Sequence, residues 1–98
     1  MWRHFFRQLF GLPVGGRFTD IQIGLIEHGT FRIRLANRST RVGIHTEVIA
    51  SRRVSTIITK TLSTWDDGAP IIASERLYLL DAATYWLETQ GNVVRSVE

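Results

Sequence analysis

The spacing of the hydrophobic residues changes at Ser74, and this change constrains the fold of the 98-residue chain more than any other feature. Between Asp20 and Leu62, apolar residues recur at every second position, which is typical of half-buried β-strands. After Ser74 they recur at every third or fourth position, which is typical of one face of an α-helix. The pattern predicts an α+β domain in which an antiparallel meander of four to five strands carries one long helix on a face.

Turn-forming residues separate the predicted strands. The alternation places strands near residues 20–25, 31–35, 42–48 and 54–62, with a last short strand at 93–97. Residues 27–30 are expected to form a hairpin turn in which Gly29 takes a positive φ, and residues 37–40 form the next turn. Trp65 precedes the acidic turn Asp66-Asp67-Gly68 and has apolar neighbours on both sides. We therefore expect Trp65 to be buried where the sheet meets the helix.

The predicted helix covers residues 74–90, with Ser74 as its N-cap and Gly91 as the residue that ends it. Rotation of about 100° per residue divides it into two sides. The side expected to cover the sheet contains Leu77, Leu79, Leu80, Ala83, Trp86 and Leu87. The opposite side contains Tyr78, Asp81, Tyr85 and Glu88. Aromatic residues with acids suit an interface with a cationic protein, so we predict partner binding there; alternatively, the tyrosines pack against neighbouring loops.

The N-terminal residues carry a second helical pattern. Spacings of three and four residues relate Trp2, Phe5, Phe6, Leu9 and Phe10. We expect a short amphipathic helix over residues 1–10 and a Gly/Pro-rich linker over 11–16, so that residues 1–16 precede a single domain at 17–98. The apolar side of this helix has four candidate positions: a face or edge of its own sheet, a membrane surface, a partner protein, or a second copy of the chain.

Charge is divided unevenly along the chain. Residues 1–60 contain ten Arg and Lys against three acids, a net +7, whereas residues 61–98 contain two Arg against six acids, a net −4. Strand alternation predicts a cationic sheet face made by Arg32, Arg34, Arg41 and His45. RNA recognition would need aromatic residues between these charges, and Phe31 points to the other side. The pattern therefore favours a solvated cationic face over a nucleic-acid site.

Residues with catalytic or metal-binding chemistry are sparse. The chain has no Cys, and His4, His28 and His45 do not have the spacing of metal ligands on one helix. The acidic pair Asp66-Asp67 adjoins a glycine, where aspartate is common for backbone reasons. We therefore expect no enzyme activity, no metal and no cofactor. The first residues lack the continuous apolar stretch of a signal peptide, and a cytoplasmic location is expected.

From about Thr19 to Glu98 the chain resembles a family of small immunity proteins that accompany polymorphic bacterial toxins. The resemblance rests on the strand meander, the Trp65-Asp66-Asp67-Gly68 turn followed by Ile71, and the closing helix with Gly91 and a short strand. It implies a non-enzymatic protein that binds and neutralises a cognate toxin, with the acidic helix side facing a basic partner. Two alternatives stay open: a small basic nucleic-acid-binding module, and a homodimer joined through the N-terminal helix.

Overall fold

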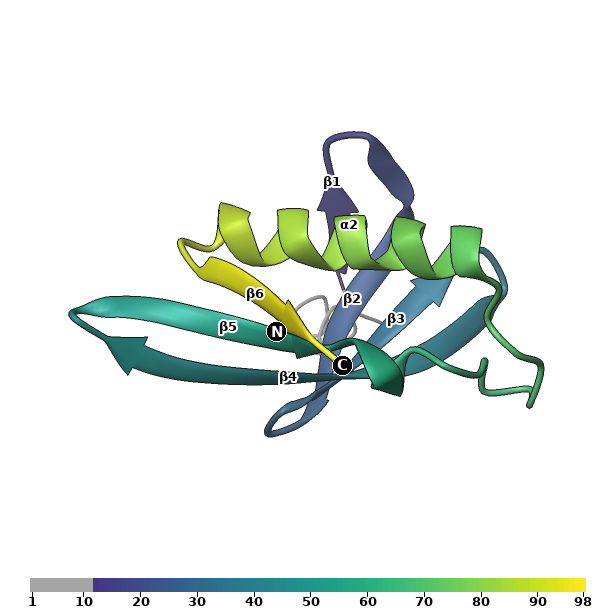
Figure 1. The fold of residues 1–98 in the computed structure, drawn as a ribbon. Helices are drawn as coiled ribbons and strands as arrows, with labels where there is room; N and C mark the ends of the chain where they lie inside the picture. The colour runs from purple at the N-terminus through teal and green to yellow at the C-terminus, as the bar shows by residue number, and fades with distance from the viewer. Residues whose placement is uncertain (1–11) are drawn as a thin grey trace.

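The computed structural model describes residues 12–98, which form a six-stranded sheet with an α-helix on one face (Figure 1). The strands lie side by side in chain order: β1 (Leu12–Gly15), β2 (Phe18–Glu27), β3 (Thr30–Leu35), β4 (Arg38–Ile49), β5 (Arg52–Ile58) and β6 (Val93–Val97). A 3-10 turn, η1 (Thr59–Thr61), follows β5, and α2 (Ala73–Thr89) leads into β6. The α+β class is confirmed. The helix predicted for residues 1–10 lies outside the described residues.

The sheet contains more strands than we predicted, because residues 12–15 of the expected linker form β1. Leu12 pairs with Ile23 and Pro13 with Gln22, and Val14 is buried. Proline is compatible with this position because β1 is an edge strand, where one row of backbone groups needs no partner strand. The flexible connector predicted for this stretch is therefore wrong for residues 12–15.

The prediction of a purely antiparallel meander is wrong at the last strand. The first five strands pair antiparallel, but β6 pairs parallel to β5, with Val54 opposite Val93 and Ile58 opposite Val97. The cause is α2, which crosses the sheet and returns the chain to the end where β5 began (Figure 1). The strand at residues 93–97 was predicted correctly, but its direction depends on the crossover.

The predicted fourth strand is shorter than residues 54–62, because the chain turns into η1 after Ile58. Thr61 Oγ1 accepts the Gly43 N–H at 2.9 Å, and the same hydroxyl donates to the Ile58 carbonyl at 2.6 Å. The Thr61 side chain thus provides β4 with a hydrogen-bond partner where a longer β5 would have provided a backbone group. Leu62, immediately after η1, is fully buried.

One hydrophobic core fills the space between α2 and the sheet. The helix contributes Leu79, Ala82, Ala83 and Leu87. The sheet contributes the inward residues of the alternation, among them Ile21, Ile23, Ile33, Val42, Ile44 and Ile57. Phe31 and Trp86 extend the core towards the C-terminal end of α2, with their ring centroids 5.4 Å apart. Within residues 12–98, no helix has the length and apolar character that crossing a membrane requires.

Trp65 is buried at the junction of sheet and helix, as predicted, with 2% of its surface exposed. The Arg38 guanidinium lies 4.5 Å from its ring centroid, and its indole N–H donates to Glu75 Oε1 at 3.4 Å. The acidic turn after it is tied to the start of β4, because the Ser39 hydroxyl donates to Asp66 Oδ2 at 2.7 Å. The turn that carries the family resemblance therefore holds the sheet–helix junction together.

The helix starts one residue earlier than predicted, and Ser74 is not its N-cap. Ile72 occupies the N-cap position, and its backbone N–H donates to Glu75 Oε1 at 3.2 Å. Ser74 therefore lies inside the first turn. At the other end the prediction is confirmed: Gly91 has φ +87°, and its N–H donates to the Glu88 carbonyl at 3.0 Å.

Candidate functional site

The solvent-facing side of α2 carries the strongest candidate for a binding surface. Leu77 is 63% exposed and Tyr85 is 37% exposed, and Asp81 and Glu88 are also exposed. Their spacings of four, four and three residues place them along one line of the helix. We call this set the α2 stripe: Leu77, Asp81, Tyr85 and Glu88. It combines one exposed apolar side chain, one aromatic ring and two carboxylates.

The stripe differs from the predicted one because Leu77 and Tyr78 have exchanged sides. Leu77 was expected in the core, but it lies two positions before the fully buried Leu79 and so about 200° around the helix from it. Tyr78 was expected on the free side, but it is half-buried and packs against the core. Its ring centroid lies 5.5 Å from that of Phe18.

The β1–β2 hairpin explains this exchange, because it stands beside α2 and provides partners for the tyrosines (Figure 1). The Tyr78 hydroxyl donates to Asp20 Oδ1 at 2.7 Å. The Tyr85 ring centroid lies 5.6 Å from that of Phe18. Arg17, in the hairpin turn, approaches Asp81 at 3.4 Å, and both side chains are well exposed. The tyrosines thus pack against a neighbouring segment, which is the alternative that the sequence left open.

Gly16 allows Tyr85 to pack against the hairpin. It has φ +57°, and a Cβ there would lie 2.8 Å from Tyr85 Cζ and 2.8 Å from its hydroxyl oxygen. Gly15 has φ +92°, but a Cβ there would have no neighbour within 4 Å. A residue with a side chain would be strained at both positive φ values, at a cost in stability of roughly 1–2 kcal/mol. Only Gly16 adds a side-chain clash.

We therefore expect Gly16→Ala to destabilise the fold by about 1 kcal/mol more than Gly15→Ala. The extra loss corresponds to the Phe18–Tyr85 aromatic contact, worth about 0.5–1.5 kcal/mol, which the displaced ring gives up. Urea unfolding of both variants measures the difference in the free energy of unfolding. In a Tyr85→Ala background the difference should vanish. Equal losses in the native background would show that the ring does not depend on Gly16.

The pKa of the Tyr78 phenol is raised above its usual value of 10.0, chiefly because its hydroxyl donates to Asp20. A phenolate could not make this bond and would face the carboxylate charge. The contribution of the bond to stability is therefore complete below the ordinary phenol pKa and is lost as the pH rises through the raised one.

Asp20→Asn should lower the pKa of Tyr78, because the charge and the strong acceptor are both removed. The chain has two tyrosines, so the ultraviolet absorbance titration is made in a Tyr85→Phe background, where Tyr78 alone reports. A titration midpoint that does not move would show that the bond to Asp20 does not form in solution.

The structure places the four predicted cationic residues on the sheet face away from α2, and all four are exposed. We call this set the arginine face: Arg32, Arg34, Arg41 and His45. Arg32 is directly opposite Arg41 in the β3–β4 register, whereas Arg34 is opposite Ser39 and His45 is opposite Thr56. Within residues 12–98, none of the four makes an ion pair. The arginine face and the α2 stripe thus lie on different sides of the molecule.

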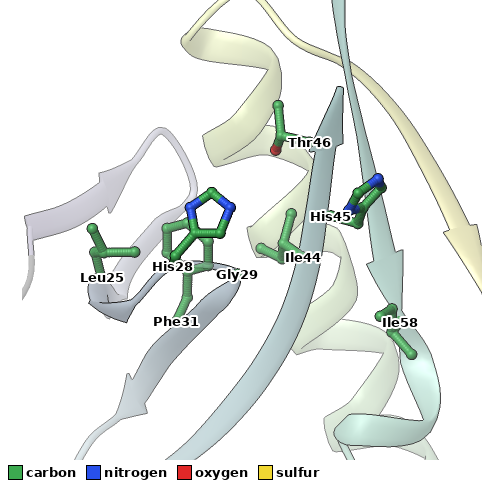
Figure 2. A pocket seen from close by; sticks show the side chains of 8 residues that line it. All are labelled: Leu25, His28, Gly29, Phe31, Ile44, His45, Thr46 and Ile58. Atoms are coloured by element: carbon green, nitrogen blue, oxygen red, sulfur yellow. The ribbon is translucent and has the colours of Figure 1, made fainter. Parts of the chain in front are cut away.

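A groove of about 380 Å³ opens where the β2–β3 turn meets β4 (Figure 2). Its lining residues are Leu25, His28, Gly29, Phe31, Ile44, His45, Thr46 and Ile58. Figure 2 shows His28 and His45 on opposite sides of β4, so they do not form a pair. Residues 12–98 contain no cluster of three or more His, Asp or Glu side chains that could hold a metal ion. The groove presents apolar side chains and two separated imidazoles.

The sequence analysis missed one residue of the α2 stripe, Leu77, and one residue beside it, Arg17. Leu77 was assigned to the core because it lies among other leucines, although its distance of two residues from Leu79 was the available signal. Arg17 carried no local signal, since its proximity to Asp81 depends on the β1–β2 hairpin.

Searches against protein-family models, curated proteins and solved structures gave no significant match to this chain.

Proposed function

We propose that this chain is a non-enzymatic binding protein that captures a cationic protein partner through the α2 stripe, in the manner of an immunity protein that neutralises a toxin. The observation that carries the proposal is Leu77. It is 63% exposed near the start of α2, at the N-terminal end of the stripe, and it makes no contribution to the core. A large apolar side chain in water is an anchor available to a partner.

The charges that follow Leu77 along the helix support a basic partner. Asp81 and Glu88 extend along the same side of the helix, within the half of the chain that has a net charge of −4. Acidic groups that follow an apolar anchor along the same helix side accelerate the approach of a cationic surface and disfavour acidic competitors. Tyr85 adds contact area at a low entropic cost, because the hairpin already restrains its ring.

The experiment that tests the proposal is site-specific photo-crosslinking in native cells. A photoreactive phenylalanine analogue replaces Leu77 in one version of the full chain and Arg41 in the other. We expect a covalent adduct with one basic protein at position 77 and none at position 41. Adducts at position 41 alone would overturn the proposal, and their sensitivity to nuclease would identify the arginine face as a nucleic-acid site. A cytoplasmic location stays a prediction.

A further inference from the structure

β4 is longer than its neighbour β3, and part of its edge therefore has no strand beside it. The pairing with β3 ends where Thr30 lies opposite Gly43, and the Ile44 N–H donates to the Gly29 carbonyl at 3.0 Å. From there β4 continues over residues 45–49, paired with β5 alone. Figure 2 shows β4 running on past the turn that carries Gly29. Among residues 12–98, no strand covers this part of the β4 edge.

The backbone groups of this open edge are available for hydrogen bonding. The Ile44 N–H faces the β3 side, and the backbone groups of successive residues in a strand alternate between its two edges. The N–H and C=O groups of Thr46 and Val48 therefore face the same side, beyond the end of β3. Natural sheets often protect such an edge with proline, lysine or a bulge. Residues 45–49 contain neither proline nor lysine, and their pairing with β5 has no bulge.

Apolar side chains lie along the same edge. Val48 is 71% exposed, and Leu25, which lines the groove at the β2–β3 turn, is 61% exposed. By alternation and register, Val48 lies on the α2 side of the sheet together with Ile44 and the groove residues Leu25 and Phe31. An extended segment placed beside β4 would therefore lay every second side chain against an apolar surface.

Glu47 gives the open edge a charge preference. It lies between Thr46 and Val48 and points to the other side of the sheet, which carries the arginine face. It is exposed, and within the described part of the chain it takes part in no ion pair. Residues directly opposite each other in neighbouring strands have Cβ atoms about 5 Å apart, so opposite charges attract there and like charges repel. The position facing Glu47 thus favours Lys or Arg.

We propose that the open edge of β4 binds an extended segment of another protein, in which a Lys or Arg stands between two aliphatic residues. The aliphatic residues lie opposite Thr46 and Val48 and exchange backbone hydrogen bonds with them, and the basic residue pairs with Glu47. Backbone pairing provides affinity, and the three side chains select the segment. The bound segment continues the line of β3 and extends the sheet.

A second copy of β4 does not fit this edge. The two longest antiparallel registers of β4 against itself across a twofold axis both fail. With Thr46 opposite Thr46, Val48 of the second copy would lie opposite Ile44, where Gly29 already lies. With Glu47 opposite Glu47, two carboxylates would face each other. The edge is therefore suited to a different chain.

Hydrogen exchange of the full chain, followed by NMR, tests this proposal with a synthetic probe. The probe is a peptide with one lysine between two valines, flanked by threonines. In the free chain, we expect the amides of Thr46 and Val48 to exchange rapidly, and those of His45 and Glu47, which face β5, to exchange slowly. Saturation with the peptide should slow the exchange of the Thr46 and Val48 amides by about tenfold or more.

Matched variants separate backbone pairing from side-chain contact. Peptides N-methylated on either valine should not bind, because these N–H groups face β4, whereas N-methylation of the lysine should leave binding unchanged. A peptide with glutamate in place of the lysine should bind several-fold more weakly. In the protein, Val48→Pro removes one N–H from the open edge and should abolish binding, while Val48→Ile should keep it. The peptide series decides the question if the proline variant does not fold.

Four results would overturn the proposal. Slow exchange of Thr46 and Val48 in the free chain at every concentration would show that another part of the chain covers the edge. Slow exchange at high concentration alone would assign the edge to a second copy. Absence of protection by the peptide, or equal binding of all N-methylated peptides, would exclude pairing with β4. The α2 stripe is not part of this edge, so these results do not depend on the partner captured at position 77.

Discussion

Replacing Trp65 with alanine is expected to reduce the free energy of unfolding by about 3–5 kcal/mol. The indole is 2% exposed and closes the end of the core between two buried neighbours, Leu62 and Ile71. Its removal leaves a cavity and leaves the Arg38 guanidinium without the ring against which it packs. For a domain of this size, each kcal/mol corresponds to roughly 4–8 °C in Tm, so thermal melting shows the loss clearly.

Trp65→Phe is the matched control for this experiment. It keeps an aromatic ring in the core and under Arg38, and removes the indole N–H that donates to Glu75 Oε1. We expect this variant to keep most of the stability that Trp65→Ala loses. Equal unfolding midpoints for Trp65→Ala and the native chain would show that the residue does not support the sheet–helix junction.

Reversing the charge of the α2 stripe, with Asp81→Lys and Glu88→Lys together, should weaken binding of the captured partner by about 2–4 kcal/mol, roughly 30- to 1,000-fold in Kd. The fold should be unaffected, because both side chains are exposed and the Arg17–Asp81 pair is a surface ion pair of small value. Calorimetric titration at two salt concentrations measures the loss and its electrostatic share.

Glu27→Lys with Glu47→Lys is the matched control, because it changes the net charge by the same amount at exposed positions outside α2. We expect this control to keep nearly native affinity. A similar loss in both double variants would mean that the partner responds to total charge and that the α2 stripe is not its contact surface.

Local patterns predicted much of this fold. The change of period at Ser74 located α2 to within one residue at each end, and Gly29 and Gly91 both take the positive φ expected of them. Alternation placed Arg32, Arg34 and Arg41 together on one face, because side chains two positions apart in a strand share a side. Trp65 was predicted to be buried from its apolar neighbours alone.

Two errors are local, the N-cap assigned to Ser74 and the core position assigned to Leu77; the others concern contacts between residues distant in sequence. Tyr78 was assigned to solvent because no nearby residue indicated that Phe18 and Asp20 would meet it from the β1–β2 hairpin. The four residues of β1 were too few, and too rich in glycine and proline, to be recognised without their partner strand. The direction of β6 depends on the path of α2 across the sheet, which periodicity does not specify.

Chemical-shift mapping of the full chain, titrated with the partner captured at position 77, tests the central claim most directly. If the α2 stripe is the contact surface, the largest changes will appear at the Leu77 methyl groups and at the backbone amides of residues 77–88. The amide chemical shifts of Arg32 and Arg41 will not change, because the side chains of these residues lie on the sheet face away from α2. Large chemical-shift changes on β3 and β4, with unchanged signals from the Leu77 methyl groups, would contradict the account. They would identify the arginine face as the binding surface.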